Sequence, residues 1–204
     1  MVKRLAIALA LLLATLLVLL LYLPEMRPQP PVSMASGAVA IGGPFTLVDA
    51  KGETVTDANL KGRYSLIYFG FTNCPDICPL ALQTMTQALE AAGPAADGVQ
   101  PVFISVDPER DTADALAGYI ANFHPRFLAL TGTVEQAREA AKSYKVYAAK
   151  APVKDADGKE TGDYTVNHTG YIYLMDRDGK YLAHFPSEAK ADEITAAIRQ
   201  LPHG

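Results

Sequence analysis

The feature that most constrains the fold is an apolar strand that leads into a cysteine loop and then into an amphipathic helix. The run Ser65 to Phe71 (SLIYFGF) is continuously apolar and too short for a helix, which predicts a central strand buried on both faces. The two cysteines of the chain, Cys74 and Cys78, follow at once. Beyond them, apolar residues recur at helical spacing until Gly93. The pattern therefore predicts both sulfurs in a loop between a buried strand and a helix.

The remainder of the globular part alternates strands with helices and ends in a hairpin and a helix. This order predicts an α/β fold, a mixed sheet with helices on both faces. Thioredoxin-like folds have this order, and they carry two cysteines where a buried strand meets a helix. The predicted elements are a hairpin around 51–52, a strand from 101 into Asp107-Pro108, a helix over 113–123, a strand from 127, a helix over 133–144, a hairpin of 171–175 with 181–185, and a helix over 191–201. The polar stretch Lys150 to Asp163 enters no predicted element.

An uncharged apolar run, Leu5 to Leu23, follows Lys3 and Arg4. As a helix it would measure about 28 Å, close to the ~30 Å of hydrocarbon in a bilayer. A cleaved signal peptide is the alternative, with 38–40 (AVA) as a cleavage-like triplet, but such peptides have apolar cores of only ~7–15 residues. We therefore expect residues 1–23 to be a single-pass anchor in a bacterial inner membrane. The positive-inside rule leaves the amino terminus cytoplasmic and the rest in the periplasm, an oxidising compartment.

Residues 24–42 are rich in proline and are expected to form an extended spacer. The globular domain then covers residues 43–204. The formal net charge of the chain is −4, which gives no support to nucleic-acid binding.

The cysteine loop has three interpretations: a structural disulfide, a redox pair or part of a metal site. A cysteine at the amino terminus of a helix has its thiolate favoured, and both nucleophilic attack and metal ligation need the thiolate. Three residues separate Cys74 from Cys78, one more than in most thiol-exchange enzymes, which leaves room for an ion without forbidding a disulfide. A structural disulfide is disfavoured, because so small a loop restricts the unfolded chain little. Redox chemistry and metal binding stay open.

His168 is the histidine that best fits a third ligand. It precedes the strand that begins at Tyr171, and in thioredoxin-like folds that loop passes beside the cysteine pair. We expect His124 and His184 to be structural and His203, next to the end, to be frayed. Two thiolates and an imidazole form a soft trigonal set suited to Cu(I), or to Cu(II) with an added ligand. A structural zinc site usually has a fourth protein ligand.

Three motifs in this order carry a resemblance to a known family. They are CPDICP at 74–79 after an aromatic-rich strand, DPERDT at 107–112 after the next strand, and His168-Thr169 before YLMD. With GPFTLVD at 43–49 and the amino-terminal anchor, they resemble the Sco/SenC family over residues 43–201. The resemblance implies a membrane-anchored, copper-binding protein of thioredoxin-like fold. Such proteins help to assemble the dinuclear copper centre of cytochrome c oxidase subunit II, as copper donors, as reductants of its cysteines, or both.

The same resemblance implies that Cys74, Cys78 and His168 hold the copper. Asp107 is expected either to be an outer-shell acceptor or partner contact, or to form a turn before a helix capped by Asp111 or Thr112. We expect a metallochaperone rather than an enzyme. The alternatives are a thiol-disulfide oxidoreductase that cycles a Cys74–Cys78 disulfide, and a copper or redox sensor. Expected partners are subunit II, another periplasmic copper chaperone or a thiol reductant, and the inner membrane.

Overall fold

The computed structural model describes residues 41–202 and four residues nearer the amino terminus, Arg4, Leu12, Leu13 and Thr15. The predicted anchor (1–23), apart from those four residues, and nearly all of the predicted spacer (24–42) lie outside the described residues, as does His203. In the part of the chain that is described, no helix is both long and apolar enough to cross a bilayer.

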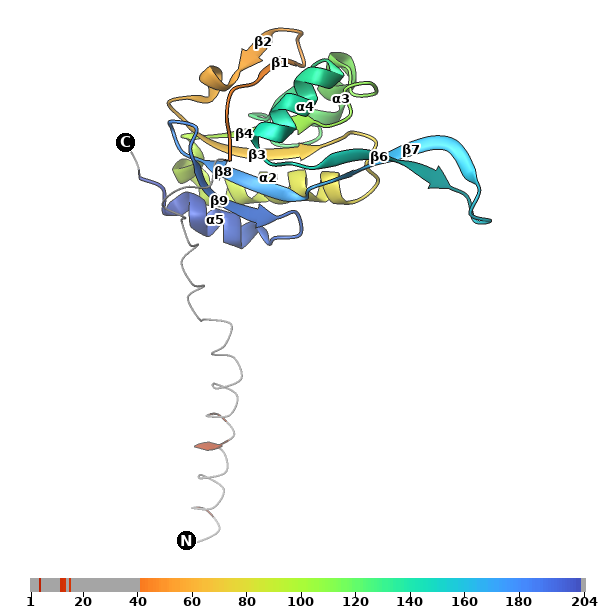
Figure 1. Cartoon of the computed structure of the whole chain (residues 1–204). Coiled ribbons are helices and arrows are strands. Elements are labelled where there is room, and N and C mark those ends of the chain that lie inside the picture. The colour runs from red at the N-terminus through yellow and green to blue at the C-terminus, as the bar shows by residue number, and fades with distance from the viewer. Residues whose placement is uncertain (1–3, 5–11, 14, 16–40, 203–204) are drawn as a thin grey trace. The chain divides into compact units, whose positions relative to one another are not determined.

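A seven-stranded mixed sheet forms the centre of the domain, in the order β2-β1-β5-β4-β3-β8-β9 (Figure 1). Strands β3, β4 and β5 are parallel, whereas β1 and β8 pair antiparallel to their neighbours. All seven residues of β3 are buried, as predicted for the central strand. The strands are β1 (Thr46–Asp49), β2 (Thr54–Thr56), β3 (Tyr64–Gly70), β4 (Val99–Ser105), β5 (Leu128–Thr131), β8 (Tyr171–Met175) and β9 (Tyr181–Pro186).

Helices cover both faces of this sheet, as predicted. On one face, α2 (Ile77–Ala92), α3 (Ala113–Ile120) and α5 (Ala191–Arg199) contribute to one apolar core with Tyr68 and Phe103. On the other face, α4 (Val134–Ser143) packs with Phe69 and Ile104. Residues that are neighbours along β3 and β4 thus enter different cores, because side chains alternate across a strand. The short helices η2 (Asp57–Leu60) and η3 (Gly93–Ala96) complete the domain.

Two predicted helix starts are confirmed in detail. The Thr112 hydroxyl caps α3 by accepting the N–H of Ala115 at 3.2 Å. At the start of α4, Thr133 and Gln136 form the predicted capping box, with bonds of 2.8 and 3.2 Å.

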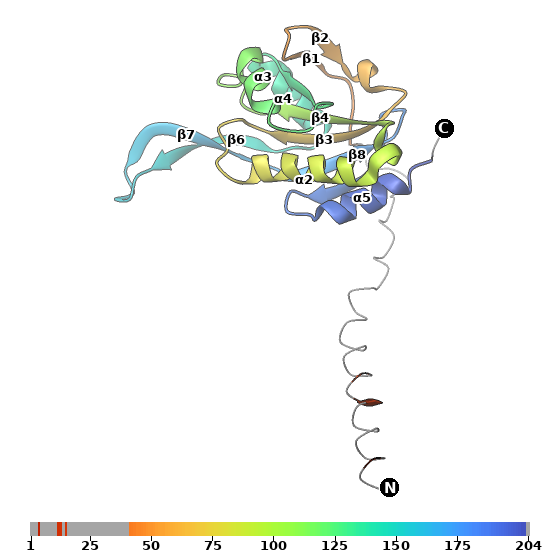
Figure 2. The ribbon, with the colours of Figure 1, turned by 180° about the vertical axis from the view of Figure 1, so that it is seen from behind.

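The stretch from Lys150 to Asp163 differs from expectation, because it belongs to a second sheet of two antiparallel strands. Strand β6 (Ala148–Lys154) pairs with β7 (Glu160–His168), and we call this hairpin the arm. Figures 1 and 2 show the arm extending beyond the edge of the main sheet. The Asp155 carboxylate organises its turn by accepting the N–H groups of Asp157 and Lys159, at 3.0 and 2.9 Å. The arm has few buried side chains, so its sequence lacks the apolar alternation by which a strand is recognised.

Candidate metal centre

The cysteine loop lies at the carboxyl end of β3, where the chain turns into α2. Cys74 is in the loop and partly exposed, whereas Cys78 is in the first turn of α2 and fully buried. Both are free thiols. The backbone N–H of Cys78 donates to Cys74 Sγ at 3.4 Å. The amino terminus of the helix thus favours negative charge on Cys74, as predicted from the sequence.

The two thiols differ sharply in acidity. The side chain of Cys78 donates a hydrogen bond that lowers the pKa of Cys74 to about 5, against the effect of burial and with help from backbone N–H groups of Asp76 and Cys78. The same bond to Cys74, followed by burial, raises the pKa of Cys78. In the reduced, metal-free protein at neutral pH, Cys74 is therefore the thiolate and Cys78 the thiol.

Buried aromatic side chains enclose the Cys78 sulfur. The Tyr68 hydroxyl, in the middle of β3, donates to Cys78 Sγ at 3.8 Å, and burial raises the pKa of Tyr68. Gly70 ends β3 directly beside the sulfur. A Cβ atom at Gly70 would lie 3.0 Å from Cys78 Sγ, 2.9 Å from Phe103 Cε2 and 2.9 Å from Tyr68 Cε1. Glycine at this position therefore makes the space that Cys78 occupies.

His168, the last residue of β7, lies against the same sulfur. Its Nε2 is 3.4 Å from Cys78 Sγ, and its Nδ1 is 3.0 Å from the carbonyl oxygen of Thr169. A carbonyl can only accept, so this contact selects the tautomer in which Nδ1 carries the proton and Nε2 keeps a free lone pair. The rings of Tyr68 and Phe71 meet the imidazole edge-on, with centroids 6.1 and 5.9 Å away. The histidine thus presents a donor atom toward the cysteine loop.

Cys74 and His168 both line a surface groove of about 800 Å³, whose walls include Phe71, Ile77 and Tyr171. Two sulfurs and an imidazole nitrogen are soft donors, and such a set favours Cu(I) over hard cations. Among the residues described, no three His, Cys, Asp or Glu side chains lie together as a group that could hold a metal ion. The cysteines and His168 are neighbours around Cys78 in an open arrangement, which a molecule in the groove can reach.

The other described histidines lie elsewhere. The backbone N–H of His124 donates to the Thr86 hydroxyl, and its Nδ1 accepts the N–H of Arg126, so it organises the turn before β5. His184 is exposed on β9, and its Nδ1 is 2.5 Å from the Tyr181 hydroxyl. Both therefore fit the structural roles predicted for them.

The two aspartates of the DPERDT segment contact different parts of the domain. The Asp111 carboxylate, fully buried, accepts bonds from the hydroxyls of Thr72 and Ser105, both at 2.6 Å, and ties the cysteine loop to β4. The helix cap is thus Thr112, and Asp111 has a different task. The Asp107 backbone forms the expected turn, and its side chain contacts Arg110 and Tyr164. The outer-shell or partner-contact role of Asp107 stays a prediction.

Sequence reasoning missed Tyr68, Gly70 and Phe71 as neighbours of the site. The aromatic character of the run before the cysteines was visible, but its pattern does not say which rings face the sulfur. That choice follows from the alternation of β3, which directs Tyr68 and Gly70 to the face covered by α2.

Comparison with known proteins finds relatives over most of the chain. A family model described as SCO1/SenC matches residues 33–203. A SCO2-like protein of Rickettsia conorii is 40% identical over 91% of this chain and 89% of its own length. The copper-bound structure of Bradyrhizobium japonicum ScoI is 45% identical, with a TM-score of 0.70 over 79% of this chain and 99% of that one. BsSco, described as having a disulfide switch and as a member of the Sco family of cytochrome c oxidase assembly proteins, is 28% identical, with a TM-score of 0.60 over 83% of this chain and 99% of that one.

The family match spans most of the chain and includes Cys74, Cys78 and His168. The solved relatives share the thioredoxin-like sheet, which agrees with the prediction of the fold from the order of the elements. The chain therefore belongs to the SCO1/SenC family.

Proposed function

We propose that this protein is a copper metallochaperone that delivers copper to, or prepares, the dinuclear copper site of cytochrome c oxidase subunit II. The ligands are Cys74, Cys78 and His168. The observation that carries the proposal is the position of His168 Nε2, 3.4 Å from Cys78 Sγ and bordering the same groove as Cys74. A relative of 45% identity with copper bound supports the choice of metal.

The open side of the site suits transfer rather than storage. Cys74 is accessible and ionised at neutral pH, so it can bind an incoming copper ion first and be the first ligand that a partner's sulfur displaces. Cys78 is buried and must lose its proton to bind the metal, and the Tyr68 hydroxyl can then donate to its sulfur. In the tautomer that Thr169 selects, the lone pair of His168 Nε2 is free to bind a metal. Copper would enter and leave through the groove.

A thiol-disulfide oxidoreductase is the second candidate, and the unequal acidity of the two thiols favours it. The Cys74 thiolate would attack a partner's disulfide to form a mixed disulfide, and Cys78 would then displace the partner's sulfur. The partner gains two electrons, one proton from Cys78 and one proton from water, while Cys74 and Cys78 become a disulfide. BsSco, the relative described as having a disulfide switch, also supports this second candidate. A sensor of copper or redox state would use the same residues but would transfer neither copper nor electrons to a partner.

The cellular setting is part of the proposal. Residues 1–23 would anchor the protein once in a bacterial inner membrane with the amino terminus in the cytoplasm, and 24–42 would space the domain from the bilayer. The domain of residues 43–204 would then work in the periplasm, where subunit II presents its copper site. Another periplasmic copper chaperone would supply it with copper again, or a thiol reductant would return its cysteines to the thiol form.

A transfer experiment separates these functions. Full-length protein in detergent, loaded with one Cu(I), is mixed with the copper-free soluble domain of subunit II, and copper and thiols are measured in both after separation. Copper appearing on a reduced subunit II domain identifies a donor. Thiols appearing on an oxidised domain, with loss of the Cys74 and Cys78 thiols, identify a reductant.

His184→Ala is the matched control, because this histidine is exposed and lies outside the groove. We expect it to transfer copper like the wild type, and His168→Ala to fail. If the wild-type protein transfers neither copper nor electrons to subunit II, the proposal is contradicted, and the sensor is the alternative that remains.

A further inference from the structure

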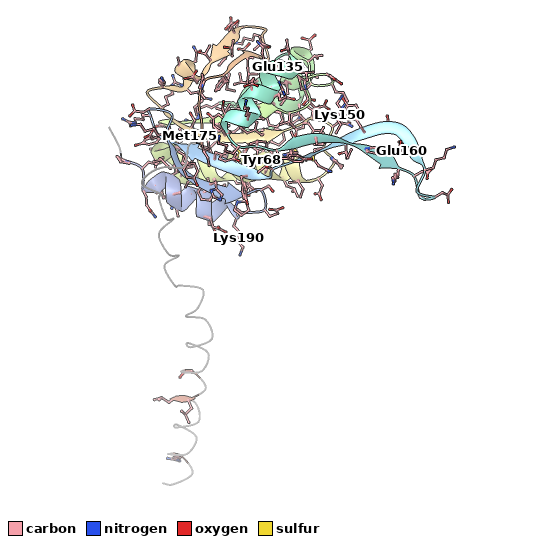
Figure 3. All side chains as sticks on the ribbon, in the orientation of Figure 1. Tyr68, Glu135, Lys150, Glu160, Met175 and Lys190 are labelled. Atoms are coloured by element: carbon pink, nitrogen blue, oxygen red, sulfur yellow. The ribbon has the colours of Figure 1, made fainter. Side chains whose placement is uncertain are left out.

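The position of His168 depends on the arm, because His168 is the last residue of β7. The arm is a sheet of only two strands, and most of its residues are exposed (Figures 1 and 2). An isolated two-stranded hairpin is at best marginally stable in water. Figure 3 marks Lys150 near the base of the arm and Glu160 farther out along it. Contacts at the base must therefore decide how firmly His168 is held.

One residue of β7, Tyr164, is gripped at this base by the segment that follows β4. Its hydroxyl donates to Asp107 Oδ1 at 2.9 Å, and its carbonyl accepts from Arg110 Nη1 at 3.0 Å. The Arg110 guanidinium carbon also lies 3.9 Å from the centre of the Tyr164 ring. Asp107 and Arg110 are joined by an ion pair of 2.5 Å. We call these three residues the clamp.

The clamp acts on the face of β7 that carries His168. Residues two apart along a strand point to the same side, so Tyr164, Val166 and His168 share one face. Val166 between them is buried, which places this face against the body of the domain. Because Tyr164 is held in place, the strand can move only a limited distance away from the domain at His168, which lies about 13 Å further along β7.

The clamp also reaches the site by a second route. The Arg110 guanidinium lies 5.9 Å from the ring of Phe71, which in turn meets the His168 imidazole edge-on at 5.9 Å. Phe71 begins the cysteine loop. The same arginine is therefore in contact with elements on both sides of the site.

The clamp contains buried charge, which is costly to keep. The Asp107 side chain is 1% exposed, and Arg110 Nη2 is buried without a hydrogen-bond partner among the residues described. Buried ion pairs are often no more stabilising than apolar residues of the same size, and some are retained because they enforce one geometry. That geometry here is the docking of β7.

From these contacts we propose that Asp107 and Arg110 are positioning residues that clamp Tyr164 and thereby hold His168 Nε2 at Cys78. This inference rests on the proposed function only in taking His168 as a copper ligand. It assigns to the DPERDT segment a task that the ligand set itself leaves unexplained.

Two variants test the clamp with little change of volume. Arg110→Lys keeps the charge but cannot reach both Asp107 and the Tyr164 carbonyl with one planar fork. Tyr164→Phe keeps the ring over Arg110 and removes only the hydroxyl bonded to Asp107. Arg138→Lys is the matched control, since Arg138 is 67% exposed and pairs with Glu135 on α4.

The first measurement is amide hydrogen exchange in the full-length, copper-free protein. In Arg110→Lys we expect the amides of residues 164–168 to exchange roughly tenfold faster or more, a factor typical for loss of a hydrogen bond to a charged group. Amides of β8 and β9 should keep their wild-type rates, and Tyr164→Phe should show a smaller effect in the same place. Uniform acceleration across the domain would mean a merely structural role and would overturn the proposal, as would unchanged exchange in both variants.

The second measurement is X-ray absorption and release of Cu(I) to a competing chelator. Both clamp variants should keep both sulfur ligands, show a weakened nitrogen contribution and release copper faster, while Arg138→Lys behaves as wild type. Wild-type nitrogen ligation and release in Arg110→Lys would contradict positioning. If wild-type protein shows no nitrogen ligand at all, the proposed function fails, but the exchange result still decides whether the clamp holds β7.

Discussion

Gly70→Ala adds one methyl group at the point where β3, α2 and the Cys78 sulfur meet. The backbone of Gly70 is in the ordinary extended region of a strand, so alanine meets no conformational barrier there. The new Cβ would instead lie 2.9 Å from both Phe103 Cε2 and Tyr68 Cε1 and 3.0 Å from Cys78 Sγ. All three neighbours are fully buried and cannot swing into solvent.

The size of the effect follows from two opposing contributions. An extra carbon in a filled core costs about 1–3 kcal/mol. Replacement of glycine by alanine also restricts the unfolded chain, which stabilises the protein by about 0.4–1 kcal/mol. We therefore expect a net loss of about 0–2.6 kcal/mol in the free energy of unfolding, centred at about 1.3 kcal/mol. For a domain of this size each kcal/mol corresponds to about 2–4 °C in Tm, so the midpoint should fall by roughly 3–5 °C at the centre of that range.

Thermal unfolding of the reduced, copper-free protein measures this change, and Gly118→Ala is the matched control. Gly118 lies in α3, where an added Cβ meets nothing within 4 Å, so the same substitution should stabilise by up to about 1 kcal/mol. The Cu(I) affinity of Gly70→Ala should fall as well, because the methyl group displaces Cys78 Sγ. A Gly70→Ala protein as stable as Gly118→Ala, with unchanged copper affinity, would refute the packing argument.

Four further predictions concern the groups in and around the cysteine loop. In the reduced, copper-free protein, alkylation should occur first at Cys74 with an apparent pKa of about 5, and Cys78→Ala should move that pKa upward because its hydrogen bond is the main cause of the shift; a midpoint near 9 in the wild type would contradict this. Since the folded-state pKa of Cys74 lies below its ordinary value of 9.0, its contribution to stability should be complete above pH 9 and lost as pH falls toward 5 in denaturant titrations. Tyr68→Phe should change the free energy of unfolding by less than about 1 kcal/mol, because a weak hydrogen bond to sulfur and the cost of burying a hydroxyl are lost together. The same variant should shift the sulfur-to-Cu(II) charge-transfer band. An unchanged spectrum would show that the hydroxyl does not influence Cys78. Burial raises the pKa of Asp111, so its contribution to the free energy of unfolding is complete below its ordinary pKa of 3.8 and declines as pH rises through the folded-state value. Asp111→Asn should therefore gain stability relative to wild type over that rise. A constant difference between the two proteins would show that this carboxyl does not titrate as described.

Local sequence patterns were sufficient for the framework of the site. The continuous apolar run of β3 and the helical spacing of α2 place both cysteines correctly, since each pattern reports burial of a single element. The approach of His168 to Cys78 joins residues 90 positions apart. Only the analogy with thioredoxin-like folds anticipated it, because no local pattern encodes a contact between distant strands.

The arm and the clamp show what local patterns could not supply. β6 and β7 are largely exposed, so they lack the apolar alternation on which strand prediction relies. Asp107, Arg110 and Tyr164 are polar residues in segments 54 and 57 positions apart, and their partnership exists only after β7 has docked. Asp111 and Thr112 were equal candidates for the helix cap, and the choice between them depended on the distant Thr72.

X-ray absorption of the full-length protein in detergent, loaded with Cu(I), tests the central claim most directly. We expect one copper per chain with two sulfur ligands and one nitrogen ligand, and loss of the nitrogen in His168→Ala but not in His184→Ala. A copper site that keeps its nitrogen in His168→Ala, or a reduced protein that binds no copper, would contradict the assignment of Cys74, Cys78 and His168 as the ligand set.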